Sequence, residues 1–120
     1  MAVKRKQQYR HSPAFILLEL AEGQIHYGAI HFVLSEKLPS FIADTAAVYR
    51  TLRHLEQRGE VVSTWDRSCA DPTSKIYHLT TLGWKKLDYW KQDIEQRLLN
   101  LHHFLTQQYF LTACLHFKQN

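Results

Sequence analysis

The segment DTAAVYRTLRHLEQRGEV, residues 44–61, predicts a helix with two different faces, and this helix decides the fold. Val48, Leu52 and Leu55 recur at helical spacing and form an apolar face suited to a core. The opposite face is basic and polar, and it consists of Arg50, Arg53, His54 and Gln57. Such a face is either simply solvated or contacts an acidic partner.

The composition indicates one globular domain. The chain has 120 residues, of which 45% are hydrophobic and 22% charged, so it can bury a core. It lacks the run of about 18 apolar residues that spans a bilayer, and its first residues do not resemble a secretory signal. Cys69 and Cys114 stand far apart, which favours a reducing, cytoplasmic location over a disulfide framework.

The positive charge is concentrated at the N-terminus. The net charge is +4, and the remaining basic residues only balance the 11 acidic ones. The excess comes from Lys4, Arg5, Lys6 and Arg10. A basic arm of this kind either follows a phosphate backbone or is a solvated tail.

Two further helices are expected before the opening segment. The first begins with Ser12 as N-cap and Pro13 in the first turn, and Gly23 follows its end. The second covers IHYGAIHFVLSEKL, residues 25–38, and ends before Pro39. Its inward-facing residues are Ile30, Val33 and Leu34. The third helix has Asp44 as N-cap and ends at Gly59.

After residue 59 the periodicity changes to that of strands. Residues 60–67 and 74–80 predict a hairpin joined by the turn-forming segment RSCADPT. We expect four hairpin-region side chains to pack on the helices: Trp65, Tyr77, Leu79 and Leu82. A long helix follows from near Leu82, capped by Thr80 or Thr81, and the apolar tail after Gln107 either continues it or folds back.

This order predicts a mainly α (α+β) winged helix-turn-helix: three helices, a two-stranded β wing and a long C-terminal dimerisation helix. The expected organisation is a basic arm over 1–11, a DNA-binding domain over 12–81, and a dimerisation helix and tail over 82–120. In such a fold the third helix, about residues 43–58, enters the major groove of DNA.

Three segments resemble the PadR family of bacterial transcriptional regulators. They are HYGAI (26–30), VYRTLRHLEQRGEVVSTW (48–65) and SKIYHLTTLGWKKLDYW (74–90). The resemblance covers about Phe15 to Trp90 and is to the compact branch with a single C-terminal helix. It implies a cytoplasmic, nucleoid-associated homodimeric repressor that binds double-stranded operator DNA and whose last helix packs against the partner subunit.

The chain departs from the family pattern in three places. The family usually has His-Gly-Tyr where this chain has His26-Tyr27-Gly28. The segment ADPTSK is less basic than the family's usual wing. Glu60 occupies a position that is usually aliphatic.

Three sets of functional residues are expected. The DNA-contacting set is Lys4, Arg5, Lys6, Arg10, Thr45, Ala46, Tyr49, Arg50, Arg53, His54, Arg67 and Lys75. The dimer-interface set is Phe15, Leu87, Trp90, Ile94, Leu98, Leu101 and Leu105. Trp84 and Trp90 are candidates to stack a small aromatic effector, or else they pack in the dimer interface.

Other functional classes have weaker support in the sequence. No nucleophile and base stand at a recognisable spacing and there is no phosphate-binding glycine loop, so we expect neither an enzyme nor a cofactor. A ferric-uptake-like regulator would need histidine-rich and paired-cysteine motifs that this chain lacks, and we expect no metal site. A protein-interaction module built on the same scaffold, without DNA binding, remains an alternative.

Overall fold

The computed structural model describes residues 10–41, 43–66 and 75–119, with the side chains of the last helix described as far as residue 116. Contacts within the chain define two compact units, residues 1–87 and residues 88–120. The first unit holds the helices and the hairpin, and the second consists of the remainder of the last helix.

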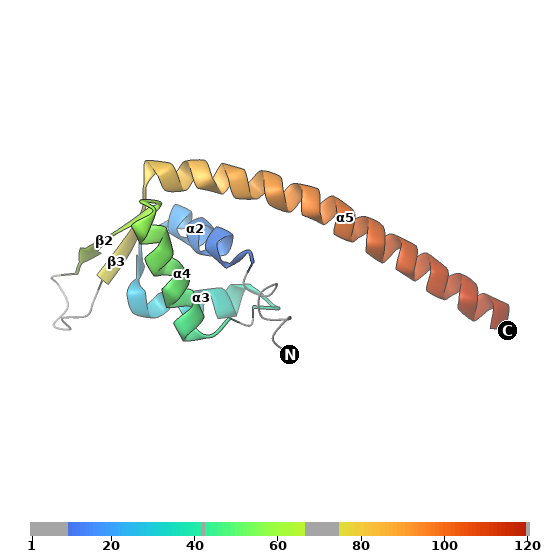
Figure 1. The fold of residues 1–120 in the computed structure, drawn as a ribbon. Coiled ribbons are helices and arrows are strands. Elements are labelled where there is room, and N and C mark those ends of the chain that lie inside the picture. The colour runs from blue at the N-terminus through green and yellow to red at the C-terminus, as the bar shows by residue number, and fades with distance from the viewer. Residues whose placement is uncertain (1–9, 42, 67–74, 120) are drawn as a thin grey trace. The chain divides into compact units, whose positions relative to one another are not determined.

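The elements follow one another in the order that the sequence predicts, with additions (Figure 1). They are α2 (Ser12–Glu22), β1 (Ile25–His26), the 3-10 helix η1 (Tyr27–Ala29), α3 (Ile30–Lys37), α4 (Thr45–Gln57), β2 (Val61–Trp65), β3 (Lys75–Leu79) and α5 (Thr81–Gln119). The fold is therefore a helix-rich α+β structure with a small antiparallel sheet.

The apolar faces of three helices and the start of the hairpin form the core. The fully buried side chains with the largest volumes are Ile16 and Leu17 of α2, Ile30 and Leu34 of α3, Val48, Leu52 and Leu55 of α4, and Val61 of β2. Burying each of them contributes about 1.5–3 kcal/mol. The predicted apolar face of α4 is thus confirmed, and its burial turns the basic face outward.

The ends of α4 are fixed as predicted. The Asp44 carboxylate accepts a hydrogen bond from the Ala47 N–H at 2.7 Å, which caps the helix. After the helix, Gly59 has φ 78°, in the left-handed region that glycine adopts without strain. The N–H of Glu60 then donates to the Leu55 carbonyl at 2.9 Å and closes the turn that leads into β2.

The predicted cap of the first helix is wrong. His11, not Ser12, occupies the N-cap position of α2, because the Phe15 N–H already donates to the His11 carbonyl at 3.1 Å. Ser12 lies inside the helix and is buried. Pro13 stands in the first turn, where no intrahelical partner is needed for its nitrogen, and Gly23 follows the last residue as expected.

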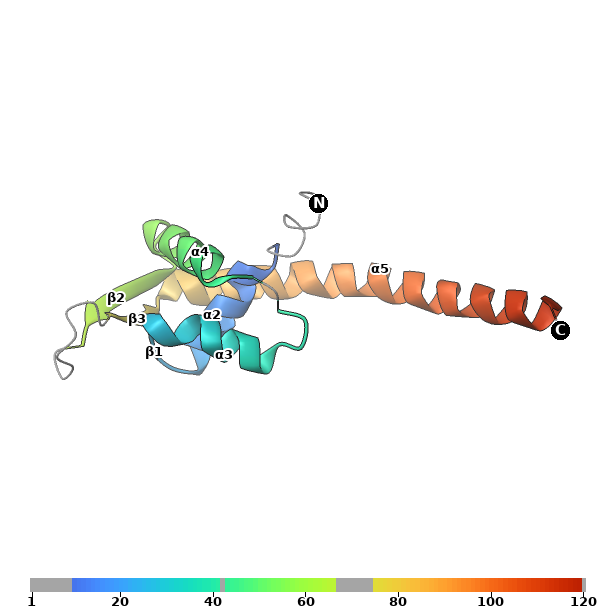
Figure 2. The same cartoon turned by 90° about the horizontal axis from the view of Figure 1, so that it is seen from below.

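The predicted second helix is shorter than expected, because its first residues form other structures. Ile25 and His26 form β1, which pairs with Tyr77 and Ile76 of β3. The sheet therefore has three strands in the order β1-β3-β2, and Figure 2 shows β1 beside β3. A two-residue strand has too few positions to show a periodicity, so its pairing partner alone defines it.

The predicted hairpin is formed by β2 and β3. Its antiparallel register runs from Val61 opposite Leu79 to Trp65 opposite Lys75. The predicted turn between the strands falls on residues 67–74, outside the described residues, as does the arm before residue 10.

The last helix continues to Gln119, so the apolar tail extends the helix. Thr80 caps it: the Thr80 hydroxyl accepts from the Gly83 N–H at 3.1 Å and donates to the Gly59 carbonyl at 2.6 Å. One residue thereby joins the start of α5 to the end of α4. No helix within the described part of the chain is long and apolar enough to cross a membrane.

Gly83 stands where α5 passes close to the backbone after α4. A Cβ added there would lie 2.2 Å from the Glu60 carbonyl oxygen and 2.4 Å from Cδ1 of Leu79. We expect Gly83→Ala to lower the free energy of unfolding by about 1–3 kcal/mol, because the contact forces backbone to move. Urea denaturation at one protein concentration measures the change.

Gly23→Ala is the matched control for this substitution. Gly23 has an extended φ of 164°, and an added Cβ there would meet nothing within 4 Å. We expect its effect to stay within about 0.5 kcal/mol. Equal losses in the two variants would contradict the close approach at Gly83.

Glu60 places a carboxylate inside the first unit. The residue is 3% exposed, and its Oε1 has no hydrogen-bond partner among the residues that the structure describes. A buried polar atom without a partner is destabilising, so Glu60→Leu should raise the free energy of unfolding by about 1 kcal/mol or more. Glu36→Leu, on the exposed side of α3, is the control, and we expect a change within about 0.5 kcal/mol. A destabilised Glu60→Leu protein would mean that the carboxylate stabilises the fold.

Candidate nucleic-acid interface

The outer face of α4 presents the residues that the sequence predicts for DNA contact. Thr45, Ala46, Arg50, Arg53 and His54 are all exposed. In the described part of the chain, the guanidinium groups of Arg50 and Arg53 have no ion-pair or hydrogen-bond partner, so both are free to bind an external acceptor. The small side chains of Thr45 and Ala46 allow another molecule to approach the first turn of the helix closely.

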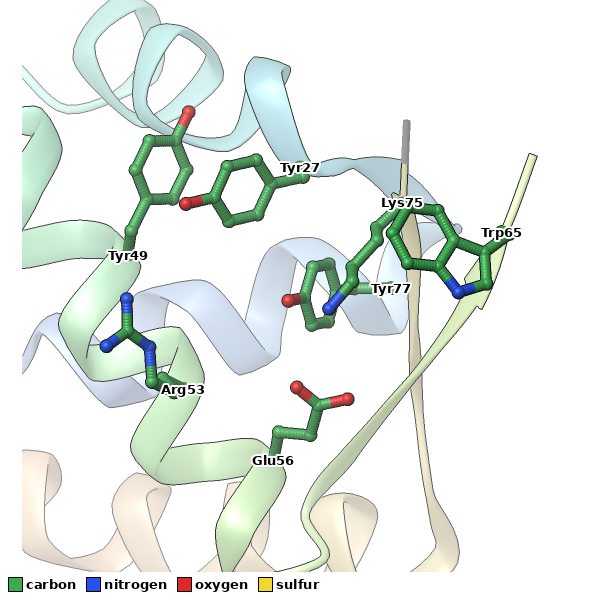
Figure 3. A pocket seen from close by; sticks show the side chains of 7 residues that line it. All are labelled: Tyr27, Tyr49, Arg53, Glu56, Trp65, Lys75 and Tyr77. Atoms are coloured by element: carbon green, nitrogen blue, oxygen red, sulfur yellow. The ribbon is translucent and has the colours of Figure 1, made fainter. Parts of the chain in front are cut away.

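Tyr49 is only partly available on this face. Its ring stacks on the ring of Tyr27, with centroids 4.0 Å apart and an interplanar angle of 15° (Figure 3). Burial against its neighbours raises the pKa of Tyr49, and the phenol of Tyr27 adds to the shift. Tyr49 therefore remains a neutral phenol at physiological pH, held in place by its stacking partner. The 3-10 turn η1, which carries Tyr27, thus supports the exposed face of α4.

The helices around α4 are tied to each other by polar contacts. Lys37 at the end of α3 bridges Glu19 and Glu22 of α2, with both Nζ–Oε2 distances at 2.9 Å. Hydrogen bonds to Glu22 and Glu19 raise the pKa of Lys37. On the other side of α3, Nε2 of His31 lies 2.9 Å from the carbonyl oxygen of Ala43, just before α4 begins. These contacts fix the position from which α4 starts.

A pocket of about 420 Å³ opens between α4 and the hairpin (Figure 3). Its lining is formed by Tyr27, Tyr49, Arg53, Glu56, Trp65, Lys75 and Tyr77. Aromatic rings form most of the wall, and two cations and one carboxylate lie among them. The pocket therefore adjoins the exposed basic face of α4.

Contacts from α4 to the hairpin hold the two sides of the pocket together. The Ser63 hydroxyl of β2 donates to Oε2 of Glu56 at 2.5 Å. Next to it, burial and the negative charge of Glu56 raise the pKa of Tyr77, so this phenol keeps its proton. At the far end of β2, Asp66 lies 2.8 Å from Nε2 of His26 and links the strand to β1.

The hairpin residues differ from expectation in two ways. Trp65 and Leu82 are 58% and 49% exposed, so the prediction that they pack on the helices is wrong, whereas Tyr77 is buried as expected and Leu79 is half-buried. Lys75 is half-buried, and its ammonium lies 5.2 Å above the Trp65 ring, the neighbour across the strand pair. The sequence did not predict the pocket; the signal that could have indicated it is the aromatic Trp65 and the cationic Lys75 at the facing ends of the two predicted strands.

The remaining residues predicted to contact DNA belong to the arm and the wing. Lys4, Arg5, Lys6 and Arg67 lie outside the described residues, while Arg10 is described and exposed. Within the described part of the chain, no three His, Cys, Asp or Glu residues are grouped so that they could hold a metal ion.

The last helix carries a long apolar stripe. Leu98, Leu101 and Leu105 are 62%, 60% and 50% exposed in the single chain. The other predicted interface residues, Phe15, Leu87, Trp90 and Ile94, are half-buried. Trp84 is exposed, and Trp90 packs edge-on against Tyr89 with centroids 5.6 Å apart. Exposed leucines at this spacing are typical of a helix that packs against another helix.

Solved structures share this fold. A PadR family transcriptional regulator from Eggerthella lenta has a TM-score of 0.72 and 18% identity, with 87% of this chain and 89% of that chain covered. A PadR-like transcriptional regulator from Bacillus cereus has a TM-score of 0.69 and 19% identity, with 82% and 96% covered. Bacillus subtilis PadR in complex with operator DNA has a TM-score of 0.61 and 25% identity, covering 68% of this chain and 47% of that one.

The family follows from the sequence match. No curated protein matched the chain. The family model described as the transcriptional regulator PadR-like family matches residues 16–89, which span α2, the basic face of α4, the hairpin and the start of α5. Members of this family are transcriptional regulators and not enzymes. The chain belongs to the PadR-like family of transcriptional regulators.

Proposed function

We propose that this protein is a homodimeric, sequence-specific repressor that reads a near-palindromic operator with α4. The observation that carries the proposal is the exposed face of α4, where Arg50 and Arg53 have no partner among the described residues. Arginine forms paired hydrogen bonds with guanine in the major groove. The Bacillus subtilis PadR structure was solved with operator DNA, which supports the same partner for this chain.

The arm and the hairpin are proposed to contact the phosphate backbone. The four basic residues of the arm are Lys4, Arg5, Lys6 and Arg10, and the wing contributes Arg67 and Lys75. Contacts of this kind increase the affinity for any DNA sequence, so discrimination between sequences is assigned to α4. Tyr49, Thr45, Ala46 and His54 complete the proposed DNA surface.

The second copy of the chain is proposed to cover the apolar stripe of α5. Its exposed leucines, together with Phe15, Leu87, Trp90 and Ile94, form the proposed dimer interface. A two-fold dimer places two copies of α4 at half-sites about 34–36 Å apart, one turn of DNA. The proposed domains are the arm 1–11, the DNA-binding domain 12–81 and the dimerisation segment 82–120. We also propose that a small aromatic effector stacks on Trp84 and Trp90. The proposed location of the protein is cytoplasmic and nucleoid-associated.

Arg50→Ala tests the reading of bases by α4. If Arg50 binds a base edge, the substitution should weaken binding to the protein's own promoter DNA by about 1–3 kcal/mol, or about 5- to 150-fold. Fluorescence anisotropy of labelled promoter fragments at one salt concentration measures the affinity. Lys91→Ala removes an exposed cation of α5 instead and should leave the affinity unchanged. Equal affinities of wild type and Arg50→Ala for promoter DNA would mean that Arg50 does not bind a base edge.

Paired charges on α5 test the dimer. In the double variant Leu98→Glu and Leu101→Glu, two charges enter the apolar stripe, so sedimentation velocity should show monomers where wild type shows dimers. The control carries two charges on the opposite side of the helix, with Gln96→Glu and Asn100→Glu, and should remain dimeric. If wild type is a monomer, or the leucine variant remains a dimer, this interface is not the one that the protein uses.

A further inference from the structure

The pocket between α4 and the hairpin combines three kinds of recognition group that DNA contact alone does not explain. They are aromatic rings, a pair of cations and a single carboxylate. A groove that only follows a phosphate backbone needs the cations but neither the rings nor the acid. The volume of about 420 Å³ is in the range of sites for small organic ligands.

The aromatic groups offer flat surfaces to a ligand. Tyr27 lies between Tyr49, at 4.0 Å, and Tyr77, at 6.2 Å, and forms one wall. Trp65 stands on β2 and is 58% exposed, so the part of its ring that Lys75 does not cover can contact another molecule. A heterocyclic base stacks on such rings whatever its identity.

The cations lie on two different elements. Arg53 comes from α4, and no described residue pairs with its guanidinium. Lys75 comes from β3, and its only described partner is the Trp65 ring at 5.2 Å. Figure 3 shows the Lys75 ammonium pointing toward α4 and into the space between the two elements. Two flexible cations on opposite sides of an opening suit a phosphate group.

The carboxylate of Glu56 indicates which class of ligand the pocket binds. Glu56 uses Oε2 to accept from Ser63, and its other oxygen, Oε1, has no partner among the described residues. In Figure 3 the carboxylate points from α4 toward Tyr77. An acid repels a simple anion, but it accepts a hydrogen bond from the exocyclic amine of a base. The neutral phenol of Tyr77 adds a donor beside it.

We propose that this pocket binds a nucleotide whose base carries an exocyclic amine: the base stacks against Trp65 and the tyrosines, Glu56 accepts from its amine, and Arg53 and Lys75 bind its phosphate. The same chemistry is present in a free nucleotide and in an unpaired nucleotide of a strand, and the free nucleotide is the assigned ligand. Because Arg53 also belongs to the proposed DNA surface, the bound nucleotide competes with the operator. This regulatory consequence rests on the proposed function, whereas the binding itself does not.

Calorimetric titration of the full-length protein with AMP, in the absence of DNA, tests the pocket. We expect saturable binding of one AMP per chain, with adenosine and ribose 5-phosphate each binding at least about tenfold more weakly because each lacks one half of the ligand. Trp65→Ala, Lys75→Ala and Glu56→Ala should each weaken AMP at least about tenfold. Arg58→Ala removes an exposed cation that follows α4 but does not line the pocket, and it should bind AMP like wild type.

Each of the following outcomes would overturn the proposal. Ribose 5-phosphate binding as tightly as AMP would make the pocket a phosphate site only. Equal losses in Arg58→Ala and Lys75→Ala would mean general charge attraction. A single-stranded adenine oligonucleotide that binds while AMP does not would assign the pocket to a strand instead of a free nucleotide.

Competition between AMP and promoter DNA is measured in a separate experiment. If AMP binds to the pocket, it should release labelled promoter DNA from wild type but not from Trp65→Ala. A protein that binds AMP yet binds no promoter would refute the proposed function and leave the nucleotide site intact. A protein that binds promoter but not AMP would refute the nucleotide site alone.

Discussion

The burial of one face of α4 is the constraint on which the rest of the structure depends. Val48, Leu52 and Leu55 are fully buried, and a helix with one face in the core must present the other to solvent. The cap at Asp44 and the left-handed Gly59 set the limits of this helix. Its rotation therefore follows from hydrophobic burial, and the outward direction of Arg50 and Arg53 is a consequence.

The second constraint is that the backbone at the start of α5 passes close to the backbone that follows α4. Thr80 bonds both to the Gly59 carbonyl and to the Gly83 N–H, and the absence of a Cβ at Gly83 admits the Glu60 carbonyl. The end of α4 and the beginning of α5 are thus joined by the contacts of Thr80 and Gly83. Since this junction lies inside the first unit, it connects the hairpin, α4 and α5 through one small set of contacts.

The pocket beside α4 overlaps the surface on which DNA is proposed to bind. Arg53 faces solvent on the helix and also lines the pocket, while Lys75 and Trp65 come from the opposite strands of the hairpin. A ligand held between α4 and the hairpin would occupy part of the surface on which DNA is proposed to lie. Exclusion of this kind needs no change of conformation, because the two partners share a residue.

The sequence by itself determined the order of elements, the buried and exposed faces of α4, its cap and its end, because these depend on local spacing and on single residues such as Asp44 and Gly59. It misplaced the cap of α2 and could not show β1, since a two-residue strand exists only through its pairing with β3. Only the tertiary structure brought Tyr27, Glu56 and Lys75 into one pocket. They lie on three elements distant in sequence, and their meeting depends on how those elements pack.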